Sequence, residues 1–175
     1  MPSEAPDGPD ADPVAVAREI ALRLLSVRDR TRLELERALA KRRVPAEAAR
    51  EVLDRLTDVG LIDDRRFAGA VFDAQHRRRR STRALRQELR NKGVDADLIE
   101  AAAAEVSSET DLAVARELVA ARARSLERFS YQVRYRRLAG QLTRRGFSAS
   151  VVASALRELP SDGADVPPGD VDYTG

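Results

Sequence analysis

The chain has 175 residues, with 31 lysines and arginines, 29 aspartates and glutamates, one histidine and no cysteine. Hydrophobic residues make up 43% of it, charged residues 34% and aromatic residues 4%. The composition excludes disulfide scaffolds, cysteine-ligated zinc, thiol catalysis and an intrinsically disordered chain, and no apolar run approaches the roughly 18–20 residues of a membrane span. The acidic, proline-rich first residues do not resemble a secretion signal, so we expect a soluble cytoplasmic protein.

The two ends of the chain differ in charge from its body. Residues 1–13 and residues 161–175 each carry a net charge of −4, so residues 14–160 carry +10. We expect residues 1–12 and 161–175 to be disordered acidic tails. Of the 31 basic residues, 29 are arginines. One explanation is a GC-rich coding sequence. The other is a polyanionic partner, because guanidinium groups bind phosphates and carboxylates well.

Residues 13–60 are predicted to form three helices. Asp12-Pro13 is a typical helix start, and Thr31 with Glu34 fits a capping box at the start of the second helix. Pro45 begins the third helix, which Gly60 ends. The residues expected to face the core have helical spacing: Ala17, Ile20, Ala21, Leu24, Leu25, Leu35, Leu39, Val52, Leu53 and Leu56.

Residues 61–106 are predicted to form three further helices. The first begins at Asp63-Asp64 and the second at Ser81 or Thr82. Gly93 ends the second helix in a left-handed conformation, and Asp95 caps the third. The apolar stripe of the first helix comprises Phe67, Ala70, Val71 and Ala74.

Residues 107–160 have the same pattern. The first helix is predicted to open at Ser107 or Ser108, and the middle helix to run from about Ser130 to Arg145. Gly146 follows it, and Ser148 caps the last helix. The first helix has an apolar stripe at Leu112, Ala115, Leu118 and Val119.

The middle and last helices of the three segments align as an internal repeat, with offsets of 50 and 53 residues. Equivalent positions are Leu35, Leu85 and Leu138; Leu39, Leu89 and Leu142; Val44, Val94 and Phe147; and Ala49, Ile99 and Val152. Since no strand-like alternation is present, the sequence predicts an all-α fold of about nine helices in three tandem three-helix repeats. Such units gain stability by docking on their neighbours, which favours an elongated, curved helical array with a long binding surface.

No motif in the chain predicts an enzyme. The lone His76 lies in a basic run, and we interpret the adjacent carboxylates Asp63-Asp64 as a helix cap. A phosphate-binding loop and a nucleophile elbow are both absent from the sequence. We therefore predict no catalytic residue, cofactor or metal.

Two basic stretches could contact a partner. Arg77-Arg78-Arg79-Arg80, with Arg83 and Arg86, places six arginines within ten residues; the alternative is a solvated run between two helices. In the second stretch, residues 129–137, Tyr131 and Tyr135 share a helix face among arginines and could stack on the bases of a single strand. The alternative there is that both tyrosines pack against the preceding helix.

The body of the chain resembles the RecX family, bacterial regulators of the RecA recombinase. The likeness covers residues 17–160 and rests on short motifs in order: Glu34-Leu35, Leu39, Val52-Leu53, Leu56, Gly60-Leu61-Ile62-Asp63-Asp64, Arg66-Phe67-Ala68, Leu85, Glu88-Leu89, Lys92-Gly93-Val94, Leu142 and Arg145-Gly146-Phe147-Ser148. Family members are built of tandem three-helix repeats. Two positions depart from the pattern: Arg43 replaces the glycine of the first basic turn, and Arg134 stands where Thr31 and Ser81 align.

The resemblance implies a non-enzymatic regulator that binds the RecA–single-strand DNA filament. It would limit filament growth, ATP hydrolysis, strand exchange and the co-protease activity behind the SOS response. The alternative is a helical DNA-binding protein that competes for single-strand DNA. We expect RecA and its filament as partners, with single-strand DNA or also double-strand DNA, no membrane, and a monomer.

The candidate contact residues for RecA or DNA are predicted from the placement of charge along the chain and not from a family motif. They are Lys41, Arg42, Arg43, Arg77, Arg78, Arg79, Arg80, Arg83, Arg86, Lys92, Arg134, Arg136, Arg137, Arg144 and Arg145.

Overall fold

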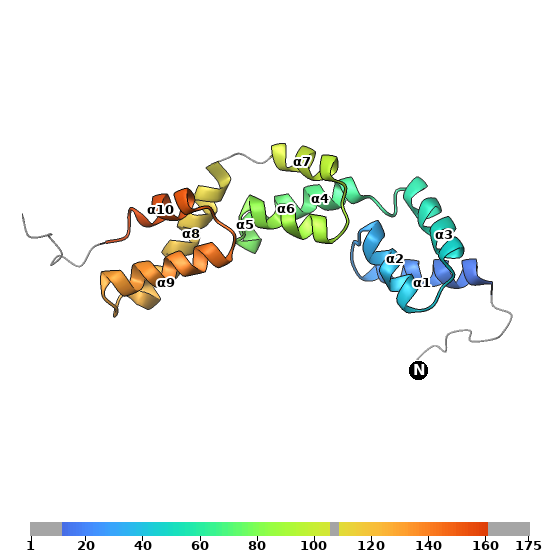
Figure 1. Ribbon diagram of the computed structural model, residues 1–175, viewed down its shortest axis with the longest axis horizontal. Coiled ribbons are helices and arrows are strands. Elements are labelled where there is room, and N and C mark those ends of the chain that lie inside the picture. The colour runs from blue at the N-terminus through green and yellow to red at the C-terminus, as the bar shows by residue number, and fades with distance from the viewer. Residues whose placement is uncertain (1–11, 106–108, 161–175) are drawn as a thin grey trace, which may run out of the picture. The chain divides into compact units, whose positions relative to one another are not determined.

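The computed structural model describes residues 12–105 and 109–160, and these residues form ten α-helices and no strand (Figure 1). Nine of the helices have eight residues or more, and α5 has four. The helices are α1 (Pro13–Val27), α2 (Arg32–Lys41), α3 (Ala46–Asp58), α4 (Asp64–Asp73), α5 (Gln75–Arg78), α6 (Thr82–Asn91), α7 (Ala96–Ala104), α8 (Glu109–Leu126), α9 (Tyr131–Arg144) and α10 (Ala149–Leu156). The predicted all-helical class is confirmed.

The helices belong to two compact units, and the division between the units passes through α6. The first unit comprises Met1–Ala74 and Leu85–Val106, and the second comprises Gln75–Ala84 and Ser107–Gly175. The predicted repeat boundaries 13–60, 61–106 and 107–160 stay predictions. The predicted acidic tails lie almost wholly outside the described residues, as does the predicted start of a helix at Ser107 or Ser108.

The first unit holds two hydrophobic clusters. One lies among α1, α2 and α3 and includes Ala17, Leu35, Leu39 and Leu53. The other joins α4 and α7 with the part of α6 that starts at Leu85, and it includes Leu89 and Ile99. Each predicted cap forms: Asp12, Asp63 and Asp95 accept backbone N–H bonds at the starts of α1, α4 and α7, and Thr31 with Glu34 makes a complete capping box.

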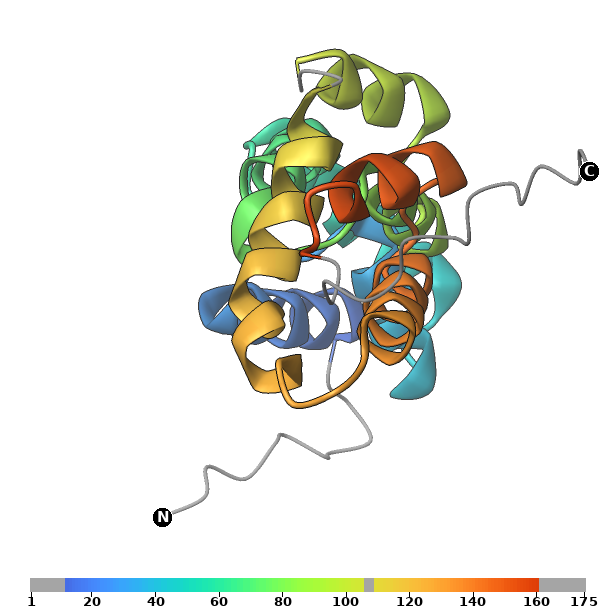
Figure 2. The ribbon, with the colours of Figure 1, turned by 90° about the vertical axis from the view of Figure 1, so that its left-hand side faces the viewer.

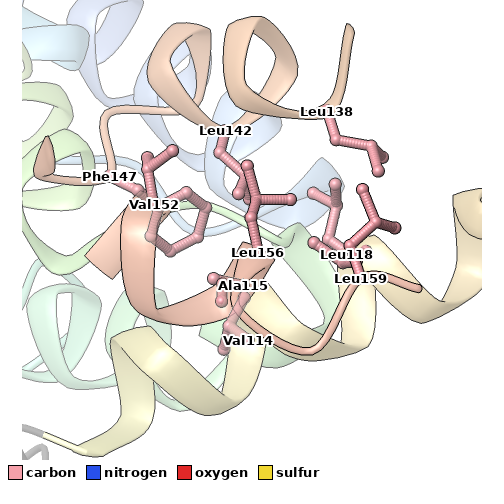
Figure 3. Close-up of a cluster of buried hydrophobic side chains, with 11 residues drawn as sticks. Val114, Ala115, Leu118, Leu138, Leu142, Phe147, Val152, Leu156 and Leu159 are labelled. Carbon is pink, nitrogen blue, oxygen red and sulfur yellow. The ribbon is translucent and has the colours of Figure 1, made fainter. Parts of the chain in front are cut away.

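The second unit has one cluster, built where α8, α9 and α10 pack together (Figure 2). Figure 3 shows Leu118 of α8, Leu138 and Leu142 of α9, and Leu156 of α10 pointing toward one another. The loop residue Phe147 completes the cluster from the turn between α9 and α10. These are the apolar faces that helical periodicity predicts.

The repeat alignment agrees with burial. Leu35, Leu85 and Leu138 are fully buried, and so are their counterparts Leu39, Leu89 and Leu142. The turns after the middle helices also match, because Arg43, Gly93 and Gly146 have φ values of +60°, +79° and +87°. Arg43 therefore adopts the left-handed backbone that glycine adopts in the other two repeats.

Three details differ from the sequence-based expectations. In α4 Ala70 is exposed, and Ala68 and Phe72 are buried in its place, because the core face of the helix follows positions 68, 71 and 72. In α8 Val114 is fully buried beside the expected Ala115 and Leu118. The short helix α5 was not expected, because it contains no apolar residue and a four-residue helix leaves no periodic pattern.

Candidate partner-binding surface

The basic turn after α2 is exposed. Lys41, Arg42 and Arg43 all lie on the surface of the first unit, and Arg42 Nη1 donates a 3.2 Å hydrogen bond to the carbonyl of Ala38. Lys41 is the last residue of α2, and Arg43, two residues later, has a left-handed backbone. These three residues remain available for a partner.

Lys92 belongs instead to a charge network inside the first unit. Its Nζ atom lies 2.6 Å from Glu34 Oε1, and Arg28 forms a second ion pair with the same carboxylate at 3.1 Å. Burial raises the pKa of Glu34, but the hydrogen bonds from Arg28, Lys92 and the Thr31 N–H outweigh it and lower the pKa to about 2. Lys92 also lies 5.5 Å from the centre of the Phe67 ring. Its ammonium group therefore stabilises the contact between the first two repeats, and we leave it out of the candidate surface.

Arg86 is likewise engaged within the first unit. Its guanidinium group makes three hydrogen bonds of 3.0–3.1 Å to the carboxylate of Glu100, which lies on α7. Fork geometry of this kind holds both side chains in place. Arg83, one turn earlier on α6, is exposed.

The arginine run 77–80 spans the end of α5 and the loop before α6. Arg77, Arg78 and Arg79 are exposed, and Arg80 is half-buried. Arg79 has a φ of +49°, and its carbonyl accepts a 2.9 Å hydrogen bond from Arg145 Nη1. The four residues differ in exposure, so the run does not form one uniform basic stripe.

Within the second unit, one acidic residue binds both sides of the arginine run 77–80. Asp111 on α8 accepts three hydrogen bonds of 2.7–2.8 Å, from Gln75 Nε2, the Thr82 N–H and Thr82 Oγ1. Gln75 is 1% exposed and also donates to the carbonyl of Arg80. The carboxylate thereby fixes the ends of the arginine run without pairing with an arginine.

The basic residues of α9 divide into buried and exposed ones. Arg134 is 7% exposed and donates a 2.8 Å hydrogen bond to the carbonyl of Pro160. Charge placement predicts a partner contact for Arg134, but its position aligns with the fully buried Thr31 and Ser81, and its side chain lies on the core face of the helix. Arg136, Arg137 and Arg144 are exposed, and none of them forms an ion pair with a described residue.

Aromatic rings lie beside these exposed arginines. The Arg137 guanidinium carbon is 4.0 Å from the centre of the Phe129 ring, and that of Arg128 is 4.9 Å from the same ring. Tyr131 and Tyr135 form a tilted pair with centroids 6.0 Å apart. Tyr131 packs against the core of the second unit, whereas Tyr135 is 37% exposed, so the alternative in which both tyrosines pack against the preceding helix does not hold for Tyr135.

The positive charge is concentrated in the second unit. Residues 75–84 and 109–160 contain 15 arginines and five acidic residues, a net charge of +10, whereas residues 12–74 and 85–105 have a net charge of −1. Arg122, Arg124 and Arg128 add exposed charge that we did not single out from the sequence, although a count of charges by segment would have found them. The residues that the structure describes contain no cluster of side chains that could hold a metal ion, and every helix among them is too short or too polar to cross a bilayer.

Comparison with known proteins gives a consistent picture. Three family models match in chain order: the first three-helix domain of RecX at residues 17–56, the second at 63–102 and the third at 109–156. The chain is 45% identical to the regulatory protein RecX of Streptomyces coelicolor, over 90% of this chain and 85% of that protein. It is 42% identical to the regulatory protein RecX of Thermobifida fusca, over 95% of this chain and 96% of that protein.

Two solved structures have a similar fold. The crystal structure of RecX from Lactobacillus salivarius matches with a TM-score of 0.71 and 23% identity, over 85% of this chain and 97% of that one. A crystal structure of a regulatory protein RecX matches with a TM-score of 0.71 and 27% identity, over 80% of this chain and 71% of that one.

Proposed function

Because this chain belongs to the RecX family of regulatory proteins, we propose that it regulates RecA by binding the RecA–single-strand DNA filament. It limits growth of the filament and lowers its ATP hydrolysis, strand exchange and co-protease activity, and so modulates recombinational repair and the SOS response. It does so in the cytoplasm, as a monomer, without catalysing a reaction.

The observation that carries this proposal is the presence of all three family domains in order over residues 17–156, at 42–45% identity to proteins named for the regulatory role. The exposed basic groups at residues 41–43, 77–79 and 136–144 support it, since they complement an acidic protein face or DNA phosphates. Tandem units also suit such a target, because linked modules gain affinity from their high effective concentration.

The test is steady-state ATP hydrolysis by RecA on single-strand DNA, titrated with the full chain. We expect hydrolysis to fall at substoichiometric amounts of the chain relative to RecA if growth of the filament is limited. An unchanged ATPase rate at saturating amounts would overturn the proposal.

A second candidate mechanism is competition for DNA, which the net charge of +10 on residues 75–84 and 109–160 favours. Binding to preformed RecA filament and to bare single strand at near-physiological salt separates the two mechanisms. Much tighter binding to the filament supports direct contact with RecA. Equal affinities would overturn direct contact in favour of competition.

A further inference from the structure

Two arginines of the second unit lie against one aromatic ring. Phe129 belongs to the loop between α8 and α9, and the guanidinium carbons of Arg128 and Arg137 are 4.9 Å and 4.0 Å from the centre of its ring. Both arginines are exposed, and neither forms an ion pair with a described residue. We call them the Phe129 arginine pair. Because two like charges are held near each other, a carboxylate beside them is favoured.

Other carboxylates of the second unit have different partners or positions. Asp111 accepts hydrogen bonds from Gln75 and Thr82. Glu158 pairs with Arg116 on α8. Glu127 directly precedes the arginine pair in the sequence, but it is exposed and forms no ion pair with a described residue. The Phe129 arginine pair is therefore not neutralised within residues 75–84 and 109–160, whose net charge is +10.

The described chain ends beside this pair. Leu159 is 7% exposed and belongs to the hydrophobic cluster of the second unit. The next residue, Pro160, is the last one described, and its carbonyl accepts a 2.8 Å hydrogen bond from Arg134 Nη2. Arg134 and Arg137 are three residues apart on α9, so they are neighbours on the helix surface. Packing and a hydrogen bond thus fix the start of residues 161–175 close to the Phe129 arginine pair.

The segment that follows carries the complementary charge. Residues 161–175 contain four aspartates and no basic residue. An extended chain spans at most about 3.6 Å per residue, so Asp162 and Asp165 lie within about 7 Å and 18 Å of Pro160. Both can therefore reach the arginine pair. A ligand on so short a tether has an effective concentration in the millimolar range, which compensates for the weakness of exposed ion pairs.

We propose that residues 161–165 bind the Phe129 arginine pair, and that the carboxylates of Asp162 and Asp165 pair with the two guanidinium groups. The chain thereby carries its own anionic occupant for these arginines, and this occupant competes with any external anion for them. The contact lies within the chain and does not rest on the proposed regulation of RecA.

The first test measures whether the segment lies at the arginine pair. Since the chain has no cysteine, Ala164→Cys provides a single attachment site for a nitroxide spin label between the two aspartates. Paramagnetic broadening of the backbone amide signals of the full chain then reports its position. The tether alone keeps the label near α9, so matched variants of equal charge supply the comparison.

Each side of the contact has its own variant and control. On the segment, D162N/D165N is compared with D170N/D172N, which removes the same charge farther along the chain. On the second unit, R128Q/R137Q is compared with R77Q/R83Q, which removes two exposed arginines outside the pair. All four variants change exposed positions or residues 161–175, so the folded core is left intact.

We expect the broadening at residues 128–137 to fall at least about threefold in D162N/D165N and in R128Q/R137Q, because each removes one side of the ion pairs. It should persist in both controls. In the parent the same loss should follow when salt is raised from about 0.1 M to about 1 M, since the Debye length falls from about 10 Å to about 3 Å.

The second test measures competition, with immobilised heparin as the external polyanion. D162N/D165N and D170N/D172N have the same net charge, but only the first frees the arginine pair. We therefore expect D162N/D165N to elute at the higher salt concentration.

Three results would overturn the proposal: equal broadening in each variant and its control, a loss in D162N/D165N without a loss in R128Q/R137Q, or equal elution of the two aspartate variants. Neither measurement contains RecA, so a failure here is distinct from a failure of the proposed function.

Discussion

Thr31 Oγ1 donates a 2.6 Å hydrogen bond to the backbone carbonyl of Lys92, 61 residues further along the chain. The same hydroxyl accepts the N–H of Glu34 and caps α2. In the second unit Ser81, which aligns with Thr31, donates its N–H at 3.2 Å to the carbonyl of Arg145, which aligns with Lys92. The start of one repeat's middle helix therefore binds the basic turn of the next repeat, and the contact occurs twice.

Replacing Thr31 by valine should destabilise the first unit. The change keeps the shape of the side chain but removes the cap and leaves the partly buried carbonyl of Lys92 without this donor, at a cost of roughly 1–3 kcal/mol. Urea unfolding measures the loss. Thr31→Ser keeps the hydroxyl and should retain most of the stability; equal losses in the two variants would show that the hydroxyl does not matter.

The equivalent leucines should be equally sensitive. Leu39, Leu89 and Leu142 are fully buried, so each change to alanine should cost about 2–5 kcal/mol, the usual loss for a buried leucine. Leu22, which is 41% exposed on α1, is the control, and Leu22→Ala should change stability by about 0.5 kcal/mol or less. Melts of all three core variants that match the Leu22 control would refute the repeat alignment.

Arg43→Gly should stabilise the protein. A left-handed backbone costs a residue other than glycine about 1–2 kcal/mol, and the larger unfolded-state entropy of glycine offsets part of this, so we expect a gain of roughly 0.5–1 kcal/mol. The neighbouring Arg42 has a φ of −94°, so Arg42→Gly should bring no such gain. Thermal unfolding of both variants checks the difference, and a destabilised Arg43→Gly would contradict it.

The Glu34 network should make stability depend on pH in acid. The pKa of Glu34 is lowered from its ordinary 4.5 to about 2, so its stabilising contribution is fully present above about pH 4.5 and is lost as the pH falls toward 2. Glu34→Gln should lower stability at pH 7 and flatten the acid limb of the curve between those values. Asp64 contributes in the opposite sense, because burial raises its pKa.

Glu36→Gln, on the exposed face of α2, is the matched control for this pH dependence. Urea titrations from pH 7 to pH 2 provide the measurement. An acid limb of the same steepness in Glu34→Gln and in the parent protein would show that the network does not carry the effect.

Arg134 should matter for stability more than its exposed neighbour. Arg134→Met removes a charged hydrogen bond to the carbonyl of Pro160 from a buried site, and we expect a loss of about 1.5–3 kcal/mol. Arg136→Met removes the same charge from the surface and should change stability by about 0.5 kcal/mol or less. Similar melting temperatures for the two variants would argue against a structural role for Arg134.

Sequence alone determined the features of this protein that depend on neighbours within about four residues. The capping box at Thr31, the caps at Asp63, Asp95 and Ser148, and the left-handed turns at Gly93 and Gly146 follow from local backbone chemistry. The positions of the buried leucines follow from the helical period, and the same pattern of leucines occurs in all three repeats.

Tertiary structure alone decided which basic side chains are available to a partner. Lys92, Arg86 and Arg134 are as basic in the sequence as Arg136 or Arg137. They are engaged because Glu34, Glu100 and the Pro160 carbonyl, 58, 14 and 26 residues away, lie beside them in the fold. The order of charges along the chain does not show which of them lie close together in the fold. An ion pair needs two side chains near each other in space, and the packing of the helices brings them together.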